Sequence, residues 1–165
     1  MQDSGLNVDN PMALAGLYGD GVFLPPDMRL WPFAIDGGYA KGILNIVSMS
    51  GNSQCPPPLR NTLVQIMGGL KKPENKLTIA DFGILNLQAQ KVNCTPESVI
   101  AGMEPRHVIL WLDSWEGESP EIRFYETGML DGLQILRCHS LPTMLADGER
   151  KKVCWNAIRA YFKDI

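Results

Sequence analysis

The segment that most constrains the fold is residues 42–50, GILNIVSMS, which carries no charge and ends at a loop rich in Gly, Ser, Asn and Pro. Its length and its run of aliphatic residues are typical of a β-strand. Too few of its positions are polar for a strand with one face in water, so we expect packed layers on both sides of it. This is the environment of a central strand in a parallel sheet.

Three further apolar runs of strand length follow along the chain. With residues 43–49, the candidate central strands are 82–87, 107–112 and 133–138. Helical segments at about 56–67 and 95–103 separate the first three, and one at about 147–162 follows the last; each is opened by a proline or a capping residue. Alternation of strands and helices predicts a three-layer α/β/α sandwich with a mostly parallel central sheet of about four strands plus edge strands.

One edge strand is expected from sequence alternation. Residues 121–125 alternate charged and apolar side chains, as a half-exposed strand does, and residues 128–132 contain two glycines and are expected to form a turn.

The chain is expected to have an N-terminal arm ahead of a single α/β domain. Residues 1–10 are polar and glycine-containing, and a short helical segment follows in which Leu14, Leu17 and Tyr18 are apolar; residues 1–20 form the arm and residues 21–165 form the domain. These three side chains either dock on a partner protein or pack on the domain itself.

Length, charge and cysteine usage limit the classes of function. A chain of 165 residues is about one domain. The net charge of -3 and pI near 5.3 do not attract nucleic acid, so a DNA contact would be weak and would need a local basic patch. The basic residues within 149–152 form either such a patch or a solvated helix face.

No cofactor, metal or membrane segment is expected. The four cysteines include no C-x-x-C pair, and neither G-x-G-x-x-G nor G-K-[ST] occurs. No apolar run approaches the ~18 residues of a membrane span, so we expect a cytoplasmic protein with reduced thiols.

Polar residues follow the predicted strands and are expected to meet at one edge of the sheet, where α/β folds bind ligands. The candidate binding residues are Asn52, Asn86, His139 and Ser140. Asn52 and His139 are the candidates for catalysis, although neither completes a catalytic motif. Neighbours on a strand point to opposite faces, so His139 and Ser140 are not expected to act as a pair, and His139 is expected to bind the backbone.

Residues 42–163 resemble the uracil-DNA glycosylase superfamily. The resemblance lies in a strand ending in Leu85-Asn86, a Thr-Pro-Glu helix start at 95–97, the strand within 105–111, and the final His-Ser-Leu-Pro at 139–142. In glycosylases the last strand ends in a His-Pro-Ser-Pro-like loop. The resemblance implies an α/β/α fold and a site that reads a flipped base.

The C-terminal pattern more closely resembles the psi subunits of bacterial DNA polymerase III, which share that fold. It consists of Leu141-Pro142, Asp147, Lys151 and Trp155, leading into an aromatic-tipped helix. The loop at 50–55 departs from glycosylases, because it offers Asn52 but lacks their Gly-x-x-Pro-Gly or Gly-Gln-Asp-Pro forms.

These departures favour a protein that has kept the glycosylase fold but has lost the catalytic activity. The resemblance to psi implies a non-catalytic adaptor that bridges proteins in a replication or repair assembly. Its N-terminal segment would grip a clamp loader and its body a second small subunit. An active glycosylase is the second hypothesis, and a small-molecule-binding α/β protein is the third.

Overall fold

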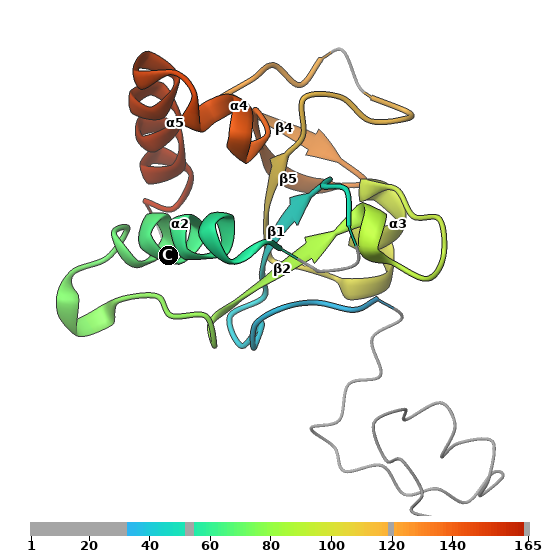
Figure 1. Cartoon of the computed structure of the whole chain (residues 1–165), viewed down its shortest axis with the longest axis horizontal. Coiled ribbons are helices and arrows are strands. Elements are labelled where there is room, and N and C mark those ends of the chain that lie inside the picture. The colour runs from blue at the N-terminus through green and yellow to red at the C-terminus, as the bar shows by residue number, and fades with distance from the viewer. Residues whose placement is uncertain (1–32, 52–54, 119–120, 164–165) are drawn as a thin grey trace, which may run out of the picture. The chain divides into compact units, whose positions relative to one another are not determined.

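The computed structural model describes residues 33–51, 55–118 and 121–163, which contain one five-stranded sheet (Figure 1). Its strands are β1 (Ile43–Val47), β2 (Phe82–Asn86), β3 (His107–Trp111), β4 (Thr127–Leu130) and β5 (Leu133–Cys138). Their order is β2-β1-β3-β5-β4, and only β4 runs antiparallel to its neighbour. The predicted α/β fold with a mostly parallel sheet is therefore confirmed.

The described part of the chain contains four helices: α2 (Pro57–Gly68), α3 (Pro96–Met103), α4 (Leu141–Leu145) and α5 (Gly148–Tyr161). Helix α2 connects β1 to β2 and α3 connects β2 to β3, while α4 and α5 follow β5. Short 3₁₀ turns lie at η2 (Pro73–Asn75) and η3 (Leu87–Ala89). The predicted caps are present. The Thr95 side chain accepts a hydrogen bond from the Ser98 amide, and Asp147 accepts from the amides of Glu149 and Arg150.

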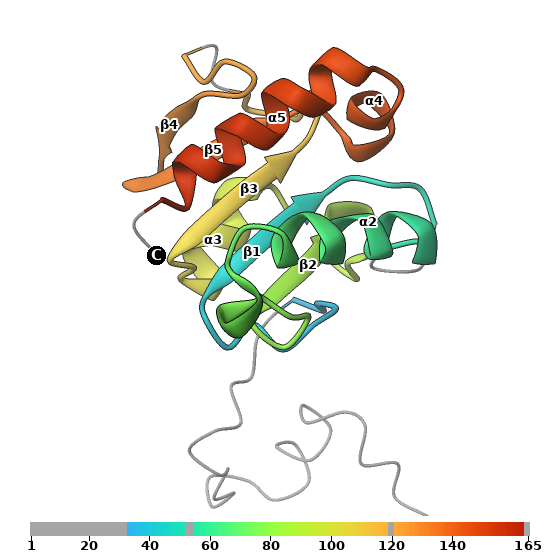
Figure 2. The ribbon, with the colours of Figure 1, turned by 90° about the vertical axis from the view of Figure 1, so that its left-hand side faces the viewer.

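The helices lie on different faces of the sheet. Helices α2, α4 and α5 pack on one face, and their buried side chains join those of the strands in a single core (Figure 2). Helix α3 lies on the other face (Figure 1). The finer expectation of a complete three-layer sandwich stays a prediction, since α3 is the only helix on that second face in the described part.

The central strand β1 is buried on both faces, as its sequence predicts. All five of its side chains are 0% exposed, including that of Asn45. The side-chain oxygen Oδ1 of Asn45 accepts a hydrogen bond from Trp111 Nε1 at 2.9 Å. The side-chain nitrogen Nδ2 of Asn45 donates to the backbone carbonyl oxygen of Gly83 at 3.4 Å. One polar side chain thus links three neighbouring strands inside the core.

The predicted edge strand at 121–125 is wrong, and the edge strand is β4 instead. Residues 121–125 form turns, while Gly128, expected in a turn, lies within β4. A Cβ at Gly128 would lie 2.7 Å from the Ile122 side chain, so glycine is needed for packing there. The turn is the Asp131-Gly132 pair, whose φ angles of 48° and 79° suit a two-residue hairpin.

The bond between Asn45 and Trp111 yields a stability prediction. We expect Asn45→Ala to lower the free energy of unfolding by about 2–4 kcal/mol, because the buried Trp111 N–H loses its acceptor and a small cavity remains. Urea denaturation measures this loss. The matched control is Asn156→Ala, an exposed position on α5, which should change stability by less than about 0.5 kcal/mol. Equal effects of the two substitutions would contradict the assigned role.

Candidate functional site

The carboxyl ends of the four parallel strands lie at one edge of the sheet. The chain leaves β1 toward β2 on one side, and β3 pairs with β1 on the other side. This reversal makes the crevice between the ends of β1 and β3 the topological switch point, where ligands bind in open α/β sheets. The polar residues after these strands therefore define the candidate site.

Asp113 is the centre of a hydrogen-bonded cluster just beyond β3. Its Oδ1 lies 2.9 Å from His139 Nδ1 and accepts from the Ser140 amide at 3.1 Å. Its Oδ2 accepts from Ser140 Oγ at 2.7 Å and from Thr143 Oγ1 at 2.9 Å. One carboxylate thus joins the end of β3 to the end of β5 and the first turn of α4.

These contacts set the ionisation of Asp113. Burial raises its pKa, but the hydrogen bonds from Ser140, His139 and Thr143 outweigh burial and lower the pKa from 3.8 to about 2. The carboxylate is therefore fully charged at neutral pH and is a weak base there.

His139 and Ser140 are adjacent but do not form a nucleophile and base. Ser140 Oγ bonds to Asp113 and accepts from the Thr143 amide as the N-cap of α4. The expectation that His139 binds the backbone is wrong, since its Nδ1 meets the Asp113 carboxylate. Helix α4 itself was missed, although Ser140 followed by Pro142 is a helix-start signal.

Asn86 is buried, and its side chain hydrogen-bonds to the loops that follow β1 and β2. Its side-chain oxygen accepts from the Met49 amide, and its nitrogen donates to the Met49 carbonyl, both at 2.9 Å. It also accepts from the Gln88 amide, and Gln88 Nε2 donates to Ser48 Oγ. Asn86 thus joins the ends of β1 and β2.

The remaining predicted site residues lie outside the described residues. These are Asn52 in the loop after β1, and Leu14, Leu17 and Tyr18 in the N-terminal arm. Their roles stay predictions. Of the four predicted binding residues, His139 and Ser140 belong to the Asp113 cluster, whereas Asn86 bonds to a different loop.

Sequence reasoning did not predict a stack of flat side chains that adjoins the Asp113 cluster through His139. The His139 ring stacks on Phe124 with ring centroids 3.6 Å apart. The Arg137 guanidinium carbon lies 4.1 Å from the centroid of the Phe124 ring and 4.9 Å from that of the Trp115 ring. Arg137 is 4% exposed and pairs with Glu118. Its only sequence signal is one arginine inside an apolar strand.

Arg137 also fixes the backbone of the long β3–β4 connection. Its Nη1 donates to the Ile122 carbonyl at 2.8 Å and its Nη2 to the Asp113 carbonyl at 3.1 Å. The charge is therefore paired and hydrogen-bonded, as burial requires. Through the second of these bonds Arg137 fixes the backbone of Asp113.

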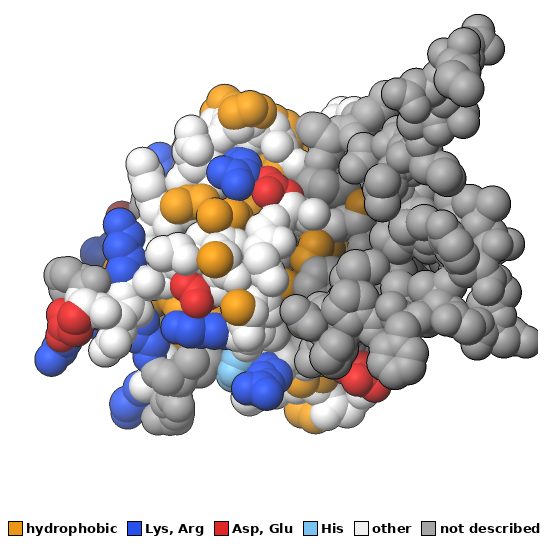
Figure 3. All heavy atoms as spheres, turned by 90° about the horizontal axis from the view of Figure 1, so that it is seen from below, with side chains coloured by type: hydrophobic (Ala, Val, Ile, Leu, Met, Phe, Trp, Pro, Cys, Tyr) orange, Lys and Arg blue, Asp and Glu red, His pale blue; other side chains and the backbone are white. Residues whose placement is uncertain are grey.

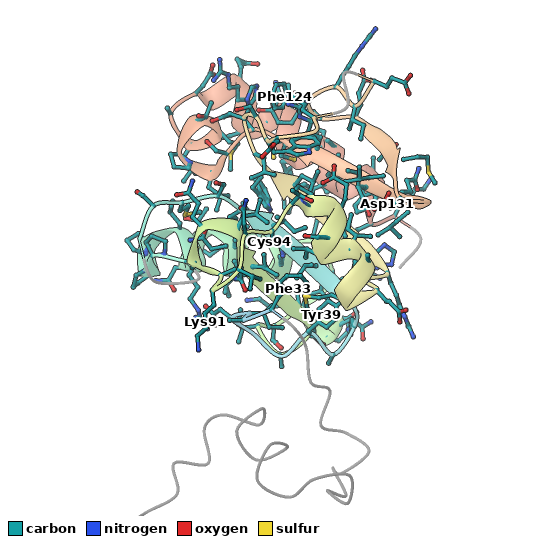
Figure 4. The ribbon with its side chains drawn as sticks, turned by 90° about the vertical axis from the view of Figure 1, so that its right-hand side faces the viewer. Phe33, Tyr39, Lys91, Cys94, Phe124 and Asp131 are labelled. Atoms are coloured by element: carbon teal, nitrogen blue, oxygen red, sulfur yellow. The ribbon has the colours of Figure 1, made fainter. Side chains whose placement is uncertain are left out.

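A cleft of about 350 Å³ lies beside the Asp113 cluster. It is lined by Ser48, Leu87, Gln88, residues 90–96 and residues 114–116. Figure 4 shows Lys91 toward the outside and Cys94 further in. Neither Asn86 nor His139 lines the cleft. Its volume falls in the range of small-ligand sites, and its walls are largely polar.

The described residues contain neither a metal-binding cluster nor a membrane-spanning helix. No group of three or more His, Cys, Asp or Glu side chains there is placed to hold a metal ion. No helix in that part of the chain has both the length and the apolar character needed to cross a membrane.

Comparison with known proteins assigns the chain to no family. No family model matches the sequence, and no curated protein matches it either. The fold and site therefore define an α/β protein with a polar switch-point cleft and a carboxylate-centred cluster beside it.

The low pKa of Asp113 predicts an acid dependence of stability. The folded pKa of about 2 lies below the ordinary 3.8, so the contribution is present above pH 4 and is lost as the pH falls toward 2. The full shift corresponds to about 2.4 kcal/mol, which solvent screening of a side chain that is 48% exposed reduces to about 1 kcal/mol.

Urea denaturation between pH 2 and 6 tests this dependence. The Asp113→Asn variant should lose less stability than the parent protein between pH 4 and 2. Asp131→Asn is the control, because asparagine is also tolerated at positive φ in the hairpin turn. An unchanged acid slope in Asp113→Asn would rule out this role for the carboxylate.

Proposed function

We propose that the chain is a non-catalytic adaptor, related to the psi subunits of bacterial DNA polymerase III, that bridges proteins in a replication or repair assembly. The proposal rests on the resemblance of residues 141–155 to psi and on the state of the Asp113 cluster. It includes a cytoplasmic location and an N-terminal segment, with Leu14, Leu17 and Tyr18, that binds a clamp loader.

The observation that carries the proposal is that Asp113 is already fully engaged. A general base must direct a free lone pair at the attacking water and works best with a pKa near the operating pH. Both Asp113 oxygens accept two contacts each from His139, Ser140 and Thr143, and the pKa is about 2. These contacts favour a carboxylate that braces α4 over one that activates water.

The switch-point cleft favours a second candidate, a DNA glycosylase. Such an enzyme reads a flipped base with hydrogen bonds to its edge and with aromatic stacking. The cleft contains the amides Gln88 and Asn93 and the ring of Trp115, whose Nε1 donates to Glu97 at 3.3 Å. These side chains suit a flat polar ligand such as a nucleic-acid base. An adaptor needs no such ligand, so binding of a base distinguishes the two candidates.

A uracil-release assay separates the two candidates. We expect no release of uracil from single-stranded or duplex DNA, because the cluster offers no free base to activate water. The assay should include a known uracil-DNA glycosylase as positive control. Robust release that is abolished by Asn52→Ala or His139→Ala would replace the adaptor with the enzyme.

Co-purification tests the adaptor directly. Tagged full-length protein in an extract of its host should retain clamp-loader subunits, identified by mass spectrometry. Deleting residues 1–20 should remove the loader but leave a second small subunit bound to the body, with a melting temperature nearly unchanged. If the deletion instead lowers the melting temperature by several degrees, the segment is part of the core. Retention of no replication protein would refute the adaptor.

A further inference from the structure

Helices α2, α4 and α5 lie on the face of the sheet opposite α3 (Figure 2). Their side chains form an apolar groove between them. Its apolar lining is Ile66 from α2, Met144 and Leu145 from α4, and Cys154, Trp155 and Ile158 from α5. Thr62 and Lys151 complete the walls. The groove is separate from the switch-point cleft, since the two share no lining residue.

The size of the groove favours an inserted side chain over a small molecule. Its volume is about 190 Å³, below the roughly 300–1,000 Å³ of small-ligand sites. Trp155 forms part of the wall and is half-buried, which is common for aromatic residues at the centre of protein interfaces. The groove therefore fits one or two apolar anchors of a docked helix.

The charges around the groove select the kind of partner. Lys151 lines the groove, and Lys152 and Arg159 lie three residues before and four residues after Trp155, on the same side of α5. All three side chains are exposed. Basic residues thus border the apolar wall of α5 along its length.

Basic residues also occur in the loop that follows α2. The Trp155 ring lies 3.0 Å from the position that a Cβ at Gly69 would take, so it reaches the end of α2. Lys71 and Lys72 lie two and three residues further along the chain, and Glu74 follows them. Figure 3 shows several Lys and Arg side chains on the left of the molecule, with acidic side chains among them.

Acidic side chains are scarce around the groove. The three groove-forming helices, all within the described residues, contain one acid, Glu149. Glu149 lies away from the groove-lining Lys151 but beside Lys152, three residues further along α5. Asp147, the N-cap of α5, pairs with Arg150. An apolar groove with a basic border, on a chain of net charge -3, favours an acidic partner through charge complementarity.

We propose that the groove between α2, α4 and α5 binds an acidic amphipathic helix of a partner protein, with its apolar side chains inserted beside Trp155 and its carboxylates against Lys151, Lys152 and Arg159. The inference deepens the proposed function, on which it rests, by naming the class of partner that the body of the adaptor binds.

The test uses the full-length chain and a synthetic probe. The probe is a fluorescently labelled peptide of about 12 residues, rich in glutamate and alanine, with Leu and Phe four positions apart. We expect saturable binding with a dissociation constant on the order of 10 µM that weakens as salt is raised. Binding should shift the indole N–H resonance of Trp155 and leave that of the buried Trp111 unchanged.

Three variants distinguish groove binding from general charge attraction. Lys151→Glu should weaken peptide binding roughly tenfold, and Thr62→Phe should weaken it similarly by filling the groove. Arg123→Glu, an exposed charge reversal that does not touch the groove, is the matched control and should bind like the parent protein. Melting curves show whether each variant remains folded. If neither groove variant weakens binding, the groove is not the site.

Probe controls separate the other possible occupants. A peptide with lysine in place of glutamate, and one with serine in place of Leu and Phe, should not bind. Stronger binding of a single-stranded oligothymidylate at the same resonance would assign the groove to nucleic acid. Concentration-dependent dimers that exclude the peptide would assign it to a second copy. Either result overturns the proposal.

The outcome is distinguishable from that of the adaptor test. If the peptide fails to bind while replication proteins still co-purify, the groove assignment falls and the adaptor stands. If the peptide binds as expected while no replication protein is retained, the groove remains a helix-binding site and the replication role falls.

Discussion

The structure depends on the complete burial of β1 between two parallel neighbours. Both edges of this strand are hydrogen-bonded, to β2 and β3, and both faces are covered. A polar side chain in such a position must find partners inside the protein. Asn45 does so with Trp111 and Gly83, and the bonds tie together the strands whose ends form the switch point. The same hydrogen bonds therefore fix both the pairing of the central strands and the position of the cleft at their ends.

Helices α2, α3 and α5 and the central strands could be predicted because their signals are local. Apolar runs of strand length, prolines in first turns and capping residues such as Thr95 and Asp147 act within a few residues of where they stand. The edge strand β4 could not be found this way. Its Gly128 is explained by contact with Ile122, and a glycine without its neighbour is read as a turn. Tertiary packing there overrides local preference.

The candidate site was predictable in position but not in its bonding. Parallel topology brings the strand ends together, so a polar rim at residues 113 and 139–140 follows from the sequence. Which partner each group takes does not follow. Asp113 is simply one polar residue after a predicted strand in the sequence, yet it accepts most of the cluster's hydrogen bonds, and Arg137 supports it from a mostly apolar strand. Both depend on contacts between residues distant in sequence.

The edges of the sheet bear on association between molecules. An unpaired strand edge is a template for pairing with another chain. At β2, Asp36 forms a bridge to Ile84 in both directions, at 2.9 and 2.7 Å, and so covers the middle of that edge. At the other end, β4 is only four residues long and lies between Glu126 and Asp131. With one edge occupied and the other short and flanked by acids, this domain is poorly suited to growing intermolecular sheets, even when it is concentrated.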